Sequence, residues 1–240
     1  MDLQTTKEKP HRDEMRPGTK MHRRNFLLFT GTAASVALVA VSCKDDVPGS
    51  DMDGGIDLGS GDTGILNYAY ALEQLEAAFY TQVMASPFSG ITAAESALLA
   101  DIRDHEIAHR EFFKSALASK AIPALSVDFS KINFNDRSSV LNTAKAFEDL
   151  GVAAYNGAGK LITDPGYLLL AGKIVSVEAR HAAWIRDILN IGSFADLASL
   201  TSSGASTANG LDAALNPPDV LAIAGNYLTT KINASNLPTA

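Results

Sequence analysis

The chain of 240 residues is poor in several residue types, and each shortage excludes a class of protein. A single cysteine excludes a disulfide within the chain and a four-cysteine metal site. Nine prolines and 18 glycines are too few for a disordered chain, whereas a hydrophobic content of 46% is typical of a globular domain.

Positive charge is scarce after Cys43. Residues 1–43 contain seven Lys or Arg and four Asp or Glu, so the remainder carries −10 within a total of −7. Because an acidic body repels phosphate, we expect no nucleic-acid partner.

An apolar run lies near the N-terminus. Arg23 and Arg24 precede a stretch from Phe26 to Val41 that contains no charged residue. A basic pair followed by such a run is the pattern of an export signal, and the run is shorter than the ~20 residues of a membrane span. The arginine pair in the sequence RRNFLL resembles a twin-arginine signal, which directs export of folded proteins. An ordinary secretory leader is the alternative.

Cys43 ends this run, directly after small residues in the sequence AVS. This resembles the lipobox of bacterial lipoproteins, and the resemblance implies that Cys43 is lipidated and becomes the mature N-terminus. A chance cysteine in a leader is the alternative. Residues 44–63 are acidic, Gly-rich and without periodicity, which predicts a flexible tether after a signal segment of residues 1–43. We expect an exported protein, anchored by lipid to a membrane of the cell envelope and facing the periplasm or the cell surface.

The rest of the chain predicts an all-α fold. Apolar residues recur with helical spacing, and Val, Ile and Thr show no alternation typical of strands. Helices are expected over residues 64–84, 92–119, 137–163 and 166–190, which together form a four-helix bundle over 64–190. Thr92 with Glu95 resembles a capping box, and Asp136 and Asp164 begin the next two helices.

Two segments outside these helices complete the predicted fold. The long connection 120–135 predicts a crossover between the second and third helices of the bundle. Residues 191–240 form a C-terminal extension, in which a short fifth helix begins after Pro217-Pro218 and packs against the side of the bundle.

The helices repeat one another in pairs. The first contains EQLEAAFY from Glu73 and the third contains EDLGVAAY from Glu148, so both read E-x-L-x-x-A-x-Y. The second contains EIAHREFF from Glu106 and the fourth contains EARHAAWI from Glu178, so both read E-x-x-H. The chain therefore uses one pair of helices twice.

Helical spacing places these polar residues on the apolar face of each helix. Four carboxylates buried together repel one another and lose their hydration unless a counter-charge is present. Two divalent cations balance the net −4 of four glutamates with two neutral histidines, and oxygen and imidazole ligands suit iron or manganese. A metal-free bundle, in which these groups pair with arginine or lie at the solvent boundary, is the alternative.

With these motifs the chain resembles the ferritin-like superfamily of di-metal carboxylate proteins, and most of all its exported group related to desiccation-associated proteins. The resemblance implies a ferritin-like four-helix bundle in which a Glu from the first and third helices and an E-x-x-H from the second and fourth bind two metal ions. The implied ligands are Glu73, Glu106, His109, Glu148, Glu178 and His181. Glu106 and Glu178 are the implied bridging carboxylates, and with Tyr80 and Tyr155, which bond a carboxylate across the site, they are the implied catalytic residues.

Three positions depart from the family's pattern. Many relatives place Asp directly before the ligand Glu, where it holds the opposing His, but this chain has His105 and Val177 there. Glu76 is additional, in the position where the third helix has Gly151. Glu76 is either a further carboxylate that swings onto a metal, as in rubrerythrin-like proteins, or a residue at the water-facing edge of the bundle.

The resemblance implies an oxidoreductase that binds two ions, Fe or alternatively Mn, and reacts with O₂ or H₂O₂. Ferroxidase activity, peroxide scavenging and disproportionation of peroxide at manganese all fit the same ligands. The alternative is a non-catalytic envelope protein for protection against stress or desiccation, or for iron binding. The oligomeric state stays open, with a dimer as one candidate.

Overall fold

The protein is described by a computed structural model over residues 54–239, and it is all-α, as predicted. The predicted signal residues Arg23, Arg24 and Cys43 lie outside the described residues. The α-helices are α2 (Gly61–Ala85), α3 (Ala93–Leu117), α4 (Arg137–Gly159), α5 (Pro165–Leu189) and α6 (Pro217–Ala224). Short 3-10 helices are η1 (Ala118–Lys120), η2 (Ala198–Ser203) and η3 (Gly225–Tyr227), and the strands are β1 (Ile56–Asp57) and β2 (Ile232–Asn233). None of the helices in residues 54–239 combines the length and hydropathy that a membrane span requires.

The helices begin at the caps that the sequence predicts. Thr92 and Glu95 form a reciprocal capping box at α3, and the Asp136 carboxylate accepts a hydrogen bond from the Ser139 amide at α4. Asp164 accepts from two amides of α5, which has Pro165 in its first turn. Each cap satisfies amides that have no partner within the helix. The main difference from prediction is that α4 ends at Gly159 instead of residue 163, because the chain turns there before the cap of α5.

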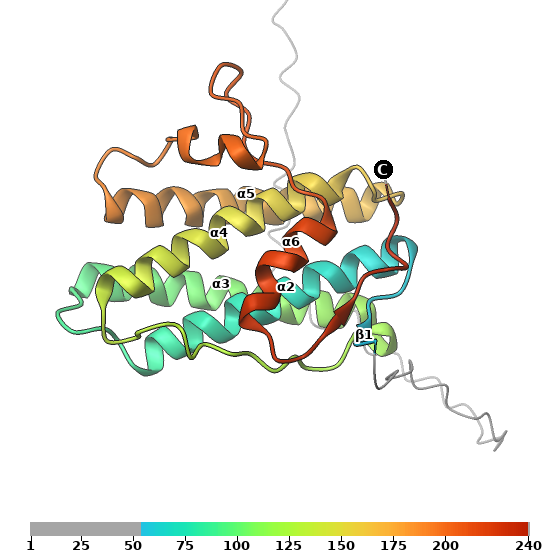
Figure 1. The fold of residues 1–240 in the computed structure, drawn as a ribbon, viewed down its shortest axis with the longest axis horizontal. Coiled ribbons are helices and arrows are strands. Elements are labelled where there is room, and N and C mark those ends of the chain that lie inside the picture. Colours follow the sequence, from blue (N-terminus) through green and yellow to red (C-terminus); the bar gives the residue numbers. More distant parts are fainter. Residues whose placement is uncertain (1–53, 240) are drawn as a thin grey trace, which may run out of the picture. The chain divides into compact units, whose positions relative to one another are not determined.

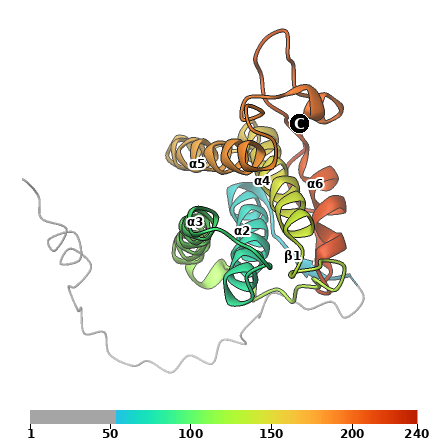
Figure 2. The ribbon, with the colours of Figure 1, turned by 90° about the vertical axis from the view of Figure 1, so that its left-hand side faces the viewer.

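Helices α2 to α5 form a bundle in which α2 packs against α3 and α4 packs against α5 (Figure 1). The view along the helices shows α3 and α5 on one side of the bundle, with α6 beyond α4 on the other (Figure 2). This arrangement explains the burial. Helices α2 and α4 are buried over most of their surface, whereas α3 and α5 bury a narrow stripe and expose their outer faces to solvent.

The connection between α3 and α4 runs along α2, as expected for the predicted crossover. Two buried amide side chains of α2 hold it in place. The Asn67 side chain accepts a hydrogen bond from the Ile122 amide and donates to the Lys120 carbonyl. The Gln74 side chain accepts from the Leu125 amide. These bonds satisfy backbone groups of a connection that has no regular structure of its own.

The segments flanking the bundle pair with each other. Strand β1 pairs in parallel with β2, so Ile56 lies beside Ile232, and Leu58 is completely buried. Residues 54–63 therefore belong to the folded domain, whereas the sequence placed them in a flexible tether over 44–63. A strand of two residues has no periodicity that a sequence can reveal. At the other end, α6 packs on α4, as predicted for the fifth helix.

Candidate metal centre

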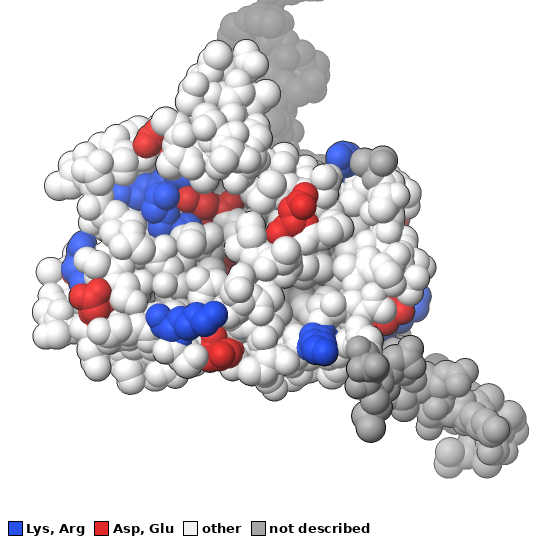
Figure 3. Space-filling model, in the orientation of Figure 1, with Lys and Arg blue, Asp and Glu red and all other residues white. Residues whose placement is uncertain are grey.

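The six predicted ligands converge inside the bundle. Each of the four core helices contributes one glutamate with no solvent exposure, and α3 and α5 each add a histidine. On the face of the protein shown in Figure 3, by contrast, acidic side chains are few and lie apart. The interior therefore holds a concentration of carboxylates that an apolar core tolerates only with compensating charge. The residues brought together are Glu73, Glu106, His109, Glu148, Glu178 and His181.

The centre has two halves that share two glutamates. In one half, ligand atoms of Glu73 and His109 lie with those of Glu106 and Glu178, all within 4.8 Å of one another. The distance from His109 Nδ1 is 2.9 Å to Glu178 Oε1 and 3.4 Å to Glu73 Oε2. These spacings leave room for one cation among the four side chains.

The second half repeats this arrangement with the other pair of helices. Ligand atoms of Glu148 and His181 lie with those of Glu106 and Glu178, again within 4.8 Å. The distance from His181 Nδ1 is 2.9 Å to Glu106 Oε1 and 3.4 Å to Glu148 Oε2. Because Glu106 and Glu178 belong to both halves, they occupy the position that a carboxylate bridging two ions requires.

Two tyrosines cross between the helices that carry the outer glutamates. The Tyr80 hydroxyl on α2 donates to Glu148 Oε1 on α4, and the Tyr155 hydroxyl on α4 donates to Glu73 Oε1 on α2. Burial and the neighbouring carboxylates raise the pKa of both hydroxyls well above 10, so both stay protonated donors. Each bond occupies one oxygen of its glutamate and leaves the other, Oε2, facing the centre.

Without metal, the centre holds protons. Burial and repulsion from neighbouring carboxylates raise the pKa of Glu106 well above 4.5. Burial also raises the pKa of Glu148, to about 7. Burial lowers the pKa of His109 and His181, but the surrounding carboxylates outweigh it and raise both to about 12. Burial raises the pKa of Glu178, but the two histidines outweigh it and lower the value to about 2. The metal-free centre is therefore stabilised by protonated imidazoles.

The donor atoms themselves test whether metal fits. Although His109 Nδ1 lies 2.9 Å from Glu178 Oε1, it has no partner in hydrogen-bond geometry. The same is true of His181 Nδ1, of both oxygens of the shared glutamates, and of the inner oxygens of the outer glutamates. Buried polar atoms are rarely left without a partner. Here they converge on two points with oxygen and imidazole donors and no thiolate, which fits two hard or borderline divalent cations.

Glu76 also faces the centre. It is 4% exposed, and burial and the charges of Glu106 and Glu178 raise its pKa well above 4.5. The alternative that placed it at a water-facing edge is therefore wrong. Gly151 on α4 leaves space for the Glu76 side chain, because a Cβ atom at Gly151 would lie 3.1 Å from Glu76 Oε1. The centre is thus asymmetric. Helix α2 has an additional carboxylate at Glu76, and α4 has Gly151 at the matching position, which leaves space for that carboxylate.

The two histidines differ in their outer contacts. His105 Nδ1 lies 2.9 Å from His181 Nε2, and the planes of the two rings are nearly parallel, with an interplanar angle of 16°. His105 therefore occupies the position in which relatives have the aspartate that holds the opposing histidine. Val177, at the corresponding position of α5, has no polar side-chain atom to offer His109. Sequence reasoning identified both substitutions but not that His105 makes the contact.

A four-helix bundle that buries two overlapping clusters of carboxylates and histidines defines a class of helical protein with a candidate metal centre. The model of the ferritin-like domain family matches residues 61–191, more than half of the chain, and the chain therefore belongs to that family. Among curated proteins, none matches the chain. The matched range covers the core helices α2 to α5 and all six predicted ligands.

Proposed function

We propose that the protein binds two divalent ions, Fe or alternatively Mn, and acts as an exported oxidoreductase toward O₂ or H₂O₂. The observation that carries the proposal is the set of buried ligand atoms without hydrogen-bond partners, which converge as two clusters with two glutamates in common. Glu106 and Glu178 would bind both ions, Glu73 with His109 would complete one half, and Glu148 with His181 would complete the other. Glu76 is an additional buried carboxylate next to the centre, which would swing onto a metal ion.

The bound ions supply the electrons for reduction of the oxidant. The residues supply position and proton control. The hydroxyls of Tyr80 and Tyr155 orient the outer glutamates so that one oxygen of each faces inward. Because ligand nitrogens bind metal only when neutral, loading removes a proton from each histidine Nδ1. Complete burial of the shared glutamates excludes bulk water from the reacting region.

Metal analysis of the purified protein tests this proposal. Wild type should hold two ions per chain, and Glu106→Ala or Glu178→Ala should lose both because each bridging carboxylate serves both halves. Glu73→Ala should lose the ion of its own half, and Glu76→Ala should lose less metal than the bridging variants. The matched control is Glu111→Ala, which removes a solvent-exposed glutamate from the same helix as Glu106. If Glu111→Ala and Glu106→Ala lose equal amounts of metal, the centre is not the metal site.

Turnover separates the enzyme from its alternative. The iron-loaded protein should consume O₂ or H₂O₂ faster than the same concentration of free iron, and Glu106→Ala should not. A protein that binds two ions and consumes neither oxidant would be the non-catalytic protein for stress protection or iron binding instead.

We also propose that the protein is exported by the twin-arginine route and anchored by a lipid at Cys43. The supporting pattern is the arginine pair before the apolar run, which ends at the only cysteine of the chain. Changing Arg23 and Arg24 to Lys should block export, and Cys43→Ala should release the protein from the membrane fraction. Ser42→Thr is the control that leaves the cysteine in place. A Cys43→Ala protein that remains membrane-bound would contradict the lipid anchor.

A further inference from the structure

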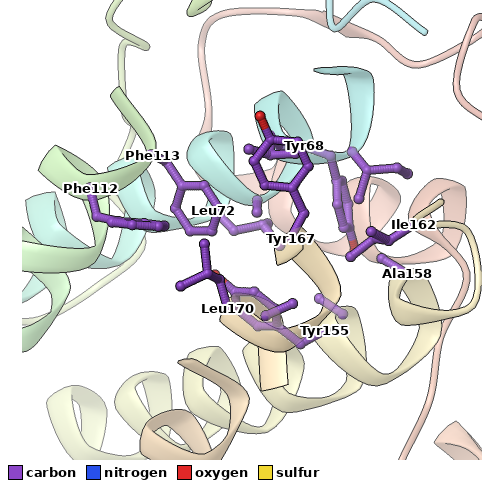
Figure 4. A pocket seen from close by; sticks show the side chains of 14 residues that line it. Tyr68, Leu72, Phe112, Phe113, Tyr155, Ala158, Ile162, Tyr167 and Leu170 are labelled. Carbon is purple, nitrogen blue, oxygen red and sulfur yellow. The ribbon is translucent and has the colours of Figure 1, made fainter. Parts of the chain in front are cut away.

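An apolar cavity lies at one end of the bundle, beside the half of the centre that contains Glu73. Its volume is about 30 Å³, and side chains from all four core helices line it (Figure 4). Leu72 on α2, Phe113 on α3, Tyr155 on α4 and Leu170 on α5 are among them. The same four helices carry the predicted ligands. The cavity and the centre therefore lie one after the other between these helices.

The cavity has an outer and an inner end. Phe112 and Tyr167 are at the outer end, because both line the cavity and both are 37% exposed. Tyr155 is at the inner end, since its ring lines the cavity while its hydroxyl donates to Glu73. A molecule in the cavity therefore lies against the ring of the tyrosine that holds a predicted ligand.

The lining decides which molecules the cavity accepts. The Tyr155 hydroxyl is used by Glu73, and the buried Tyr68 hydroxyl has no partner. A water there would find one free hydroxyl, below the two to four partners that buried waters typically have. Cavities of this kind stay dry and accept small apolar molecules. A volume of about 30 Å³ admits a diatomic molecule but not an organic substrate.

We propose that this cavity binds dioxygen and supplies it to the Glu73–His109 half of the centre. The inference rests on the proposed function and selects O₂ over H₂O₂ as its oxidant. Dioxygen is apolar and moves favourably from water into apolar surroundings. Hydrogen peroxide donates and accepts hydrogen bonds, which it would lose in this cavity at a cost.

A polar species has a different approach. A groove of about 210 Å³ between α3 and α5 has apolar walls from Leu98, Ile102, Val177 and Trp184, and it also offers the polar side chains of Asp101, His105, Arg180 and His181. It reaches the other half of the centre, at His181. Charged side chains therefore line the groove but not the cavity, so peroxide can hydrogen-bond along the groove, and filling the cavity should slow dioxygen without slowing peroxide.

Xenon, an apolar probe that needs no metal, tests the cavity itself. Crystals of the metal-free protein pressurised with xenon should show one xenon atom in the cavity, next to the Tyr155 ring. Ala158→Leu places a larger side chain on the cavity wall and should abolish this peak. Ala144→Leu is the matched control, because it makes the same change at a buried position of α4 outside the cavity. Ala171→Leu, at a half-buried wall position on α5, replaces Ala158→Leu if that variant fails to fold.

Kinetics test the delivery. With ferrous protein mixed with O₂, Ala158→Leu should slow iron oxidation by about tenfold, a barrier increase of about 1.4 kcal/mol. Oxidation by H₂O₂ should stay within about twofold of wild type, and Ala144→Leu should resemble wild type with both oxidants.

The outcomes separate the two claims. Absence of xenon from wild type, or equal O₂ rates in Ala158→Leu and wild type, overturns the dioxygen cavity and leaves the di-metal proposal standing. Equal slowing with O₂ and H₂O₂ also overturns it, because the substitution then acts on the centre itself. Failure of wild type to bind either iron or manganese overturns the di-metal proposal, and dioxygen delivery to the centre falls with it.

Discussion

At the scale of single residues, His105 makes the two ligand histidines of the centre unequal in their outer contacts. A histidine that binds metal through Nδ1 needs its proton on Nε2, and a partner at Nε2 selects that form. His105 Nδ1 lies 2.9 Å from His181 Nε2 and can accept a hydrogen bond from the N–H there. His109 receives no such help from Val177. We therefore infer that His105 is a positioning residue for His181.

Removing His105 should weaken metal binding at one half only. His105→Ala should lower the affinity of the half containing His181 by about 10–100-fold, the typical effect of losing the partner of a ligand. His105→Asp, which restores an acceptor, should recover most of the affinity. Metal titration gives the affinities, and ¹⁵N NMR of the His181 ring in the metal-free protein reports which nitrogen carries protons.

The control for this prediction is Asp104→Ala, which changes an exposed neighbour on α3. Equal losses for Asp104→Ala and His105→Ala would assign the effect to surface charge. A ring spectrum of His181 unchanged in His105→Ala would show that the contact does not position the ligand.

At the scale of elements, a glycine allows the C-terminal extension to dock on the bundle. The backbone of Leu215 crosses α4 so closely that a Cβ atom on Gly157 would lie 1.7 Å from the Leu215 carbonyl oxygen. Hydrogen bonds secure the crossing. The Leu215 amide donates to the Ala153 carbonyl, and the Asn156 side chain donates to the Ala213 carbonyl. The extension therefore depends on the absence of one side chain.

Gly157→Ala should lower the free energy of unfolding by about 1–3 kcal/mol, the usual cost of inserting atoms into a packed contact, despite the better helix propensity of alanine. Gly172→Ala is the matched control on α5, where a Cβ atom meets nothing within 4 Å. It should stabilise the protein by about 0.5–1 kcal/mol. Chemical denaturation of both variants measures the difference. Stabilisation by both would mean that the extension docks without the close crossing.

At the scale of the whole molecule, the buried charges link stability to pH and metal. A group whose pKa is higher in the folded than in the unfolded state stabilises the fold at low pH and loses that contribution as pH rises. For Glu148 the loss falls between 4.5 and about 7, and for the two histidines between 6.5 and about 12. Glu178 acts in the opposite sense, but its window lies between 4.5 and about 2.

The free energy of unfolding of the metal-free protein should therefore fall as the pH rises from about 5 to 8. Over the same range the affinity for metal should rise, because the ligands must lose their protons before they bind. Melting curves with chelator or Mn²⁺ should show a difference in Tm that grows over this range. Binding adds RT ln(1 + [L]/Kd), about 2.7 kcal/mol at a hundredfold excess over Kd. Glu148→Gln should flatten the pH dependence of the metal-free protein. A metal-free Tm that rises with pH would contradict the assignment.

The sequence by itself determined the all-α fold, the repeated helix pair and which face of each helix carries the polar residues. These follow from local spacing, because 3.6 residues per turn place Glu73 and Tyr80, or Glu106 and His109, on one stripe. The caps Thr92, Asp136 and Asp164 were readable for the same reason, since a cap bonds amides within three residues.

The tertiary structure alone decided the contacts between elements. It buried Glu76 against Gly151, placed His105 on His181, and brought Leu215 onto Gly157. It also ordered residues 54–63 through pairing with β2, and enclosed the apolar cavity between four helices. Periodicity states which face of a helix is inward but not its rotation or its distance from the next helix. Those quantities are set when all side chains pack together, and they decide which buried charge meets a partner and where space remains.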